Sequence, residues 1–115
     1  MTESCLFCKI VSGEIKGAIV FHDDQATAFR DISPVAPTHI LIVPNRHITS
    51  VSALEDGDEK LMGHLFTVAG QLAKNEGVAE GGYRLITNTG PDAGQTVFHI
   101  HMHLIGGQPM KHPMG

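Results

Sequence analysis

Three histidines near the end of the 115-residue chain, His99, His101 and His103, alternate with apolar residues. Such alternation is typical of a β-strand, in which every second side chain points to the same face. The pattern predicts a strand over residues 98–105, with three imidazoles on one face and the side chains of a core on the other. Because core packing does not require imidazoles on the opposite face, this histidine row is a candidate functional site.

Other short stretches of the chain predict the remaining strands. Residues 18–22 and 26–30 flank a polar turn, which is the pattern of a β-hairpin. Residues 39–43 form an apolar, β-branched run that ends at a proline. Residues 83–88 form a fourth strand, and residues 89–97 form a loop with two glycines. We therefore expect an antiparallel meander sheet, with both of its faces partly covered.

Two helices are expected to pack on this sheet. The longer one begins at a capping box of Asp56 and Glu59, carries an apolar stripe at helical spacing and ends near Gly77. A short helix covers residues 5–12. The sequence therefore predicts a single α+β domain over residues 1–115, with an irregular tail from about residue 108.

Composition narrows the class of function. Eight Lys and Arg stand against 12 Asp and Glu, which gives a formal net charge of −4. There is no basic block, so we expect no binding of nucleic acid. No apolar run reaches the roughly 18 residues of a membrane helix, and the polar, acidic residues 1–4 do not resemble a secretory signal. We expect a cytoplasmic protein that does not bind a membrane.

The two cysteines, Cys5 and Cys8, leave three interpretations open. A structural disulfide is not expected in a reducing compartment. A redox pair is disfavoured because too few residues precede Cys5 for the strand that such a motif follows. The cysteines could instead be small core side chains, or two ligands of a metal whose other ligands lie elsewhere in the chain.

The histidine row itself admits two kinds of chemistry. Neighbouring imidazoles could share a metal ion, but the first and third lie roughly 13 Å apart in an extended strand, and no carboxylate is close in sequence. Alternatively, imidazole acts as a nucleophile, acid or base near neutral pH, and cationic donors beside it suit an anionic substrate. Backbone N–H groups of the loop over residues 89–97 could bind phosphate oxygens. This favours imidazole chemistry on an anionic substrate.

Residues 99–105 match the signature of the histidine triad superfamily. Residues 28–34, residues 36–39 and the Gly94 and Gln95 pair resemble the Hint branch of that superfamily, and the resemblance extends from about residue 7 to residue 107. It implies a homodimer of an α+β fold, with the long helix at the interface. The implied activity is hydrolysis of the P–N bond of purine nucleoside 5′-phosphoramidates, typically those of adenosine.

The resemblance also implies a role for individual residues. His101 would attack the α-phosphorus and form a nucleotidyl-histidine intermediate, which water then cleaves, while His103 and His39 would orient and stabilise the reacting groups. Thr96 stands where the branch often has serine, as a donor beside the leaving amine. Phosphate oxygens would be held by Asn88, Gln95, Thr96 and N–H groups near Val97. The ribose would be bound by Asp31. The base pocket would be lined by Leu6, Phe7, Ile10, Phe29, Ile32 and Leu41.

Residue type alone leaves simpler interpretations of these positions open. Phe7, Phe29 and Ile32 could be plain core residues. Asp31 could be a turn residue, because Ser and Pro follow it closely. His39 could be a structural histidine at the start of its strand.

The superfamily also implies partners for the cysteine pair. In many bacterial members, zinc joins an N-terminal Cys-x-x-Cys pair to a histidine after the third strand and to the first histidine of the triad. The corresponding residues are Cys5, Cys8, His47 and His99, a closed tetrahedral set of structural type. Catalysis itself would require no metal, because imidazole supplies the nucleophile.

Two other functions remain open. The same chemistry could act on another substrate, in a dinucleoside polyphosphate hydrolase or a nucleotidyl transferase, although the Hint-like residues 31–34 and the short tail argue against it. Alternatively, the chain could be a zinc-stabilised nucleotide-binding or interaction module with incidental turnover. The presence of all three histidines argues against this second alternative.

Overall fold

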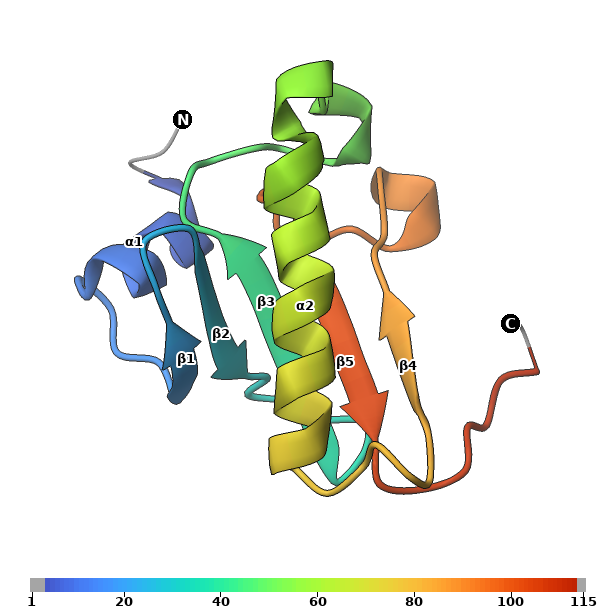
Figure 1. Ribbon diagram of the computed structural model, residues 1–115. Helices are drawn as coiled ribbons and strands as arrows, with labels where there is room; N and C mark the ends of the chain where they lie inside the picture. Colours follow the sequence, from blue (N-terminus) through green and yellow to red (C-terminus); the bar gives the residue numbers. More distant parts are fainter. Residues whose placement is uncertain (1–3, 114–115) are drawn as a thin grey trace.

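A five-stranded antiparallel sheet organises the chain, of which the computed structural model describes residues 4–113 (Figure 1). The strands are β1 Ile19–His22, β2 Ala26–Arg30, β3 Thr38–Pro44, β4 Tyr83–Ile86 and β5 Met102–Gly106. Their order is β1-β2-β3-β5-β4. The predicted α+β class is therefore confirmed, but the sheet is not a simple meander. The last strand, β5, lies inside the sheet, where Met102 and Leu104 are buried, whereas β4 is half-exposed and forms an edge.

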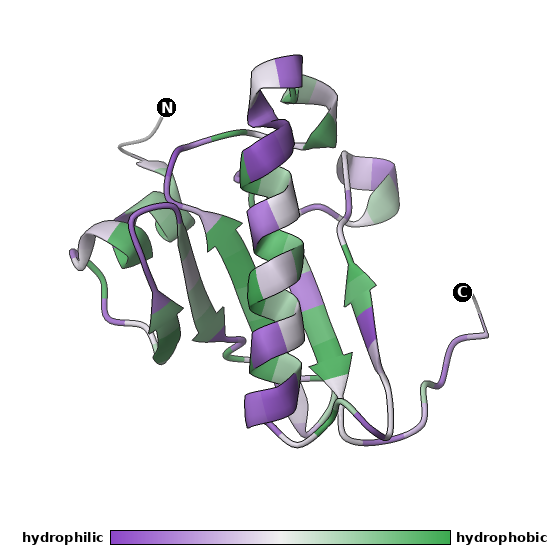
Figure 2. Cartoon of the chain, in the orientation of Figure 1, coloured by the Kyte–Doolittle hydropathy of each residue, from purple (hydrophilic) through white to green (hydrophobic). Residues whose placement is uncertain are grey.

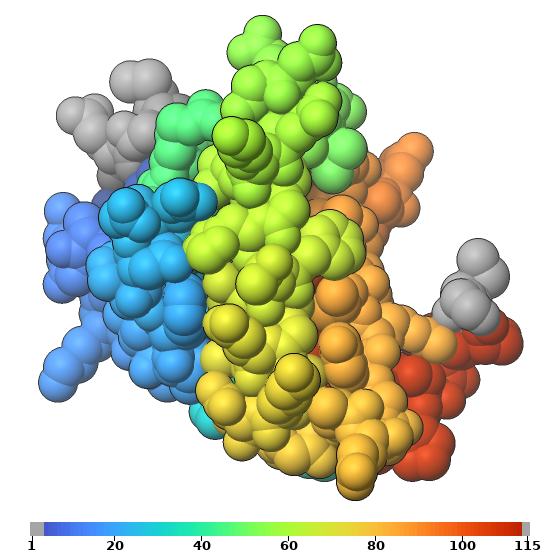
Figure 3. All heavy atoms as spheres, viewed as in Figure 1, coloured from blue at the N-terminus to red at the C-terminus, as the bar shows by residue number. Residues whose placement is uncertain are grey.

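The long helix α2, Glu59–Asn75, crosses one face of the sheet (Figure 1). Apolar residues of α2 such as Leu65 and Val68 pack on Ile40 and Ile42 of β3 and on Leu104 of β5. Figure 3 shows α2 across the centre of this face, with the N-terminal part of the chain on one side and β4 on the other. Figure 2 shows that hydrophilic segments gather at both ends of α2, while the strands beneath it are largely hydrophobic.

The start of α2 differs from the predicted capping box. Glu55 and Asp58 form the box, and the Glu55 N–H donates to the Asp58 carboxylate at 2.9 Å. A 3-10 turn, Asp56–Asp58, precedes the α-helix, so both partners lie one residue earlier than the predicted pair of Asp56 and Glu59. The predicted end is confirmed, because Gly77 adopts φ 75° and its N–H donates to the Lys74 carbonyl at 3.1 Å.

A short helix, α1 (Leu6–Ser12), packs on the opposite face of the sheet. Phe7 and Ile10 of α1 are buried against Phe29 of β2 and Leu41 of β3, which alternate with the residues that face α2. The prediction that both faces are partly covered is therefore confirmed. In the part of the chain that the structure describes, no helix is long and apolar enough to cross a membrane.

The two strands near the histidine row are shorter at this end than predicted. β4 ends at Ile86, and β5 begins only at Met102. The segment before β5 is held by single bonds instead of a ladder: the Ile100 N–H donates to the Ile48 carbonyl at 2.6 Å, and the Thr87 hydroxyl donates to the His101 carbonyl at 2.8 Å. The ladder between β3 and β5 stops because β3 ends at Pro44, which has no N–H to donate.

Candidate functional site

The imidazoles of the histidine row lie on the face of the sheet that α1 covers. The rings of His101 and His103 are in contact, with centroids 5.1 Å apart. Phe7 of α1 packs edge-on against His101 at 5.0 Å and against His99 at 6.0 Å. Met102 and Leu104 point to the core beneath α2. The predicted division of this segment into a histidine face and a core face is therefore confirmed.

A main-chain group determines which nitrogen of His101 is protonated. The His101 Nδ1 lies 2.8 Å from the His99 carbonyl, which can only accept, so Nδ1 carries the proton. In the neutral ring, Nε2 then has a free lone pair. His101 is 7% exposed and lines a cavity that a ligand can enter.

A second chain of hydrogen bonds determines the tautomer of His103. The Val35 N–H donates to His39 Nδ1 at 3.2 Å, which places the His39 proton on Nε2. That Nε2–H lies 2.9 Å from His103 Nδ1 and 3.5 Å from a carboxylate oxygen of Asp31. Because Nδ1 of His103 accepts, its Nε2 carries the proton and is the donor available to a ligand.

The pKa values of these two histidines are lowered. Burial, with help from the neighbouring rings of His101 and His39, lowers the pKa of His103 to about 4. Burial also lowers the pKa of His39, although the Asp31 carboxylate opposes the shift. Both rings are therefore neutral at pH 7, as the chain of hydrogen bonds requires.

A cavity of about 310 Å³ opens beside His101 and His103. This histidine cavity is within the usual size range of small-molecule sites. Most of the residues proposed from the sequence line it: Leu6, Phe7, Ile10, Phe29, Asp31, Ile32, Leu41, Thr96, Val97, His101 and His103. The edge-on contact of Phe7 with Phe29, at 5.3 Å, makes an aromatic corner in its wall.

Three of the proposed residues do not line the histidine cavity. His39 is buried behind His103. The Gln95 amide is buried in the loop after β4, where it accepts from the Gly90 N–H and donates to the Thr49 and Val97 carbonyls. Asn88 follows β4 and is half-buried.

The histidine cavity has further lining residues that no sequence motif indicated, namely Lys16, Gly17, Ala18 and Arg30. A Cβ at Gly17 would lie 2.9 Å from Cγ2 of Ile10, so a side chain there would press on the cavity wall. A glycine just before a strand is the only local signal, and it does not identify Ile10 as its neighbour. No pattern in the sequence indicates that Lys16 and Arg30 line the same cavity.

The structure brings Cys5, Cys8, His47 and His99 together, and their ligand atoms all lie within 4.8 Å of one another. Nδ1 of His99 is 3.3 Å from the Cys5 sulfur and 3.3 Å from Nδ1 of His47, which is 3.4 Å from the Cys8 sulfur. Ligands of tetrahedral zinc are separated by about 3.3–3.8 Å, given bonds of about 2.0–2.3 Å. This Cys–His cluster therefore has the spacing of a metal site.

The donor chemistry of the Cys–His cluster also fits a metal. The His99 Nε2–H donates to the Pro44 carbonyl at 2.8 Å, so its Nδ1 lone pair is free for a metal. Burial lowers the pKa of His99, which keeps that ring neutral. In the absence of a cation, burial and the neighbouring Cys5 raise the pKa of the Cys8 thiol to about 11. Such a thiol is a poor redox nucleophile, which disfavours the redox interpretation of the pair.

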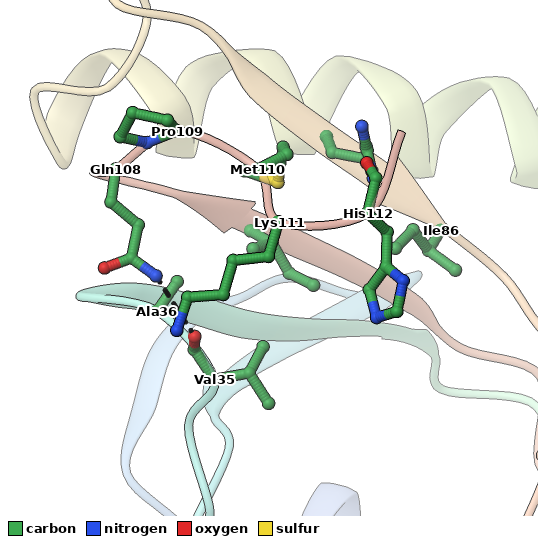
Figure 4. Close-up of a pocket in the computed structure, with 10 residues that line it drawn as sticks. Val35, Ala36, Ile86, Gln108, Pro109, Met110, Lys111 and His112 are labelled. Atoms are coloured by element: carbon green, nitrogen blue, oxygen red, sulfur yellow. Dashed lines mark hydrogen bonds between the residues drawn. The ribbon is translucent and has the colours of Figure 1, made fainter. Parts of the chain in front are cut away.

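A larger cavity, of about 440 Å³, lies under the C-terminal tail (Figure 4). Its lining includes Val35 and Ala36, Ile86 of β4 and the tail residues from Gln108 to His112, and the Gln108 amide donates to the Val35 carbonyl at 3.4 Å. It contains no residue of the histidine row. The chemistry of the row therefore belongs to the smaller histidine cavity.

Comparison with known proteins gives consistent matches. Residues 12–110 match the model of the HIT domain family. The purine nucleoside phosphoramidase of Escherichia coli (strain K12) is 54% identical over 110 residues, which is 96% of this chain and 92% of that protein.

Two solved structures match the fold as well. The HIT family hydrolase from Legionella pneumophila Philadelphia 1 has a TM-score of 0.94 and 48% identity, over 97% of this chain and 100% of that one. The histidine triad nucleotide-binding protein from Candida albicans has a TM-score of 0.82 and 30% identity, over 97% of this chain and 85% of that one. With the fold, the histidine row and these matches in agreement, the chain belongs to the HIT domain family.

Proposed function

We propose that this chain hydrolyses the P–N bond of purine nucleoside 5′-phosphoramidates through a nucleotidyl intermediate on His101. One observation carries the proposal. His101 donates a hydrogen bond from Nδ1–H to the His99 carbonyl, so its Nε2 has a free lone pair, and the residue lines the histidine cavity. The phosphoramidase of E. coli, at 54% identity, supports the class of substrate.

The proposed reaction has two displacements at phosphorus. In the first, the His101 Nε2 lone pair bonds to the α-phosphorus while the P–N bond to the amine breaks. The leaving amine takes up a proton from solvent as the bond breaks, while His103 Nε2–H or the Thr96 hydroxyl donates a hydrogen bond to its nitrogen. In the second, water attacks phosphorus and the bond to His101 breaks. The products are the nucleoside monophosphate and the amine, and the attacking water returns one proton to solvent.

The hydrogen-bonded chain from Val35 through His39 to His103 supports a donor role for His103. Because His39 donates to Nδ1 of His103, the proton of His103 remains on Nε2. A neutral donor that is already oriented stabilises developing charge on phosphate or amine without reorganisation. His39 therefore acts as a positioning residue behind His103.

The lining of the histidine cavity supports a nucleoside as ligand. The corner of Phe7 and Phe29, with aliphatic neighbours, offers a flat apolar surface to a purine. The Asp31 carboxylate lines the same cavity and can accept hydrogen bonds from two ribose hydroxyls. Gln95 would fix the loop whose N–H groups bind phosphate oxygens. Asn88, which follows β4, would contact phosphate directly.

We further propose that the Cys–His cluster holds zinc. The cluster supplies two thiols and two imidazoles, and the Nδ1 lone pair of His99 is free for a metal. A bound zinc would stabilise both thiolates and hold α1 on the sheet; none of the displacement steps needs it. Cys5 and Cys8 are free thiols placed as metal ligands, which is typical of proteins in a reducing compartment. We therefore propose that the protein lies in the cytoplasm.

A homodimer is also proposed. β4 is at an edge of the sheet, where its outer backbone groups are open to pairing with a second copy. Phe66 on α2 is 59% exposed and Tyr83 on β4 is 38% exposed, so large apolar surface is available to cover.

The test of the proposed function is turnover of adenosine 5′-phosphoramidate. We expect His101→Ala to lower kcat by about three orders of magnitude or more, while AMP still binds. His22→Ala is the matched control, because His22 is exposed on β1 outside the cavity, and it should keep full turnover.

Other outcomes would favour other functions. Turnover that survives in His101→Ala would overturn the assigned nucleophile. Faster cleavage of dinucleoside polyphosphates than of the phosphoramidate would favour the polyphosphate hydrolase. Loss of turnover on chelation, in protein that stays folded, would favour catalysis at a metal.

A further inference from the structure

The Cys–His cluster joins two separate parts of the molecule. Cys5 and Cys8 belong to α1 and its N-cap, where the Cys8 N–H donates to the Cys5 sulfur at 3.3 Å. His47 follows β3 and His99 precedes β5. With only seven residues, α1 is far too short to be stable as an isolated helix, so its place on the sheet depends on such attachments.

The same helix supplies a wall of the histidine cavity. Phe7 lies between the two cysteines in sequence, yet its ring faces His101 at a centroid distance of 5.0 Å and an interplanar angle of 89°. Leu6 and Ile10 of α1 line that cavity too. Any shift of α1 at the cluster therefore moves the aromatic side of the cavity.

His99 provides a second connection between the cluster and the cavity. Its Nδ1 points into the cluster, where the Cys5 sulfur lies at 3.3 Å. Its carbonyl accepts from His101 Nδ1 at 2.8 Å, and its Nε2–H is held by the Pro44 carbonyl at 2.8 Å. A metal on His99 would therefore fix the main-chain group that orients His101.

We propose that a metal in the Cys–His cluster and a nucleotide in the histidine cavity bind cooperatively, with Phe7 and His99 as the positioning residues that connect them. This inference rests on the proposed function, because it assumes that a nucleotide occupies the cavity. Binding linkage is reciprocal, so the factor by which zinc tightens AMP must equal the factor by which AMP tightens zinc. We expect a factor of about five or more, the lower end of typical couplings.

The experiment measures both directions of this linkage. Calorimetry gives the Kd of AMP for zinc-loaded protein and for protein stripped with a chelator. Competition with a chromophoric chelator gives the zinc affinity with and without saturating AMP, corrected for zinc bound by AMP itself. The rate of zinc transfer from loaded protein to the chelator is a third readout, which does not depend on the stability of the stripped protein. We expect AMP to slow this transfer about fivefold or more.

Two matched variants test the route of the coupling. Phe7 and Phe29 both line the histidine cavity and touch each other, but only Phe7 lies on the helix that carries the cysteines. Phe29→Leu should weaken AMP binding and keep the coupling factor. Phe7→Leu should weaken AMP binding and lower the coupling factor, leaving only the connection through His99, without changing the zinc affinity measured in the absence of AMP.

The outcomes separate this inference from the proposed function. Equal zinc affinity with and without AMP in the wild-type protein would overturn the cooperativity and leave the phosphoramidase proposal intact. An equal loss of coupling in both phenylalanine variants would overturn the role of Phe7. A protein that takes up no zinc would overturn the inference as a whole. Failure of zinc-loaded protein to bind AMP would overturn the nucleotide site and the function with it.

Discussion

Single main-chain groups hold three histidines of the site. The Val35 N–H holds His39, and the Pro44 and His99 carbonyls hold His99 and His101 respectively. Each of these bonds determines the tautomer of its ring, and each comes from a backbone position that a substitution of the side chain leaves in place. The tautomers of these three rings are therefore set by the backbone path, whereas that of His103 depends on the side chain of His39.

The lowered pKa of His103 predicts a loss of stability in acid. The pKa is about 4 in the folded protein, against about 6.5 for an unfolded histidine. Between these values the unfolded chain binds more protons, so the free energy of unfolding falls as the pH drops through this window. His103 alone accounts for up to about 2 kcal/mol between pH 6.5 and pH 5.

Urea denaturation at a series of pH values checks this prediction. His103→Asn removes the titrating ring, so its stability should depend less steeply on pH over the same window. Parallel curves for the two proteins would contradict the assignment, since His39, Asp31 and His101 remain next to the substituted position in both.

Asp31 should confer recognition of the ribose. Hydrogen bonds to a charged group contribute about 1.5–3 kcal/mol, so Asp31→Asn should weaken AMP binding roughly ten- to hundredfold. The same variant should bind the 2′,3′-dideoxy analogue of AMP about as well as the wild-type protein does. Calorimetry with both nucleotides measures this, and an equal loss for both would show that Asp31 acts on the fold instead of on the hydroxyls.

The sequence predicted which residues belong to the candidate site, but it predicted only part of what each of them contacts in the fold. The alternation around His101 predicted a shared face because the strand period is local. Gln95 illustrates the limit: the resemblance implies a phosphate role, and the structure adds that its amide braces the loop through Gly90, Thr49 and Val97. Thr49 lies far away in the sequence, so no local pattern could indicate this bond.

The end of a helix or strand is predictable when residues next to it in sequence determine it, and not when a residue distant in sequence does. The end of α2 at Gly77 was predictable because a C-terminal cap uses neighbouring residues only. The start of β5 at Met102 was not predictable, because it depends on where the distant partner strand β3 stops pairing, just before Pro44. The capping box lies one residue earlier than predicted because it caps the 3-10 turn Asp56–Asp58 that precedes α2, instead of the α-helix itself.

Adjacent residues of α2 should differ sharply in their contribution to stability. Leu72 is 3% exposed within the core, so Leu72→Ala should lower the free energy of unfolding by about 2–5 kcal/mol. Gln71 is exposed, and Gln71→Ala should change it by no more than about 0.5 kcal/mol. Chemical denaturation of the zinc-loaded proteins compares the two, and similar effects would contradict the described packing of α2 on the sheet.

At the scale of the whole molecule, the two faces of the sheet have separate tasks. The face beneath α2 holds a continuous apolar core, in which the side chains of Ile40, Ile42 and Leu104 are wholly buried. The other face holds α1, the Cys–His cluster and the histidine cavity. Because alternate residues of β3 and β5 serve the two faces, the site rests directly on the core strands and inherits their rigidity.

The proposed dimer predicts a measurable mass. Light scattering should give twice the 12.3 kDa of one chain at micromolar concentration. Phe66→Ser removes an exposed ring from α2 and should raise the monomer fraction without lowering helix content. A monomer mass for the wild-type protein would contradict the dimer, and an unchanged dimer in Phe66→Ser would place the interface away from this part of α2.

The place of β5 within the sheet has a consequence for how the protein is made. A ribosome synthesises β4 well before the strand that pairs with it, so β4 has no neighbour in the sheet until β5 emerges. The same late segment carries the histidine row. The addition of β5 therefore completes the sheet and assembles the site in one event. A nascent chain that lacks this segment has neither a complete sheet nor a site. A truncated translation product would be recognisable to cellular quality control as incompletely folded, and it could not act on nucleotides prematurely.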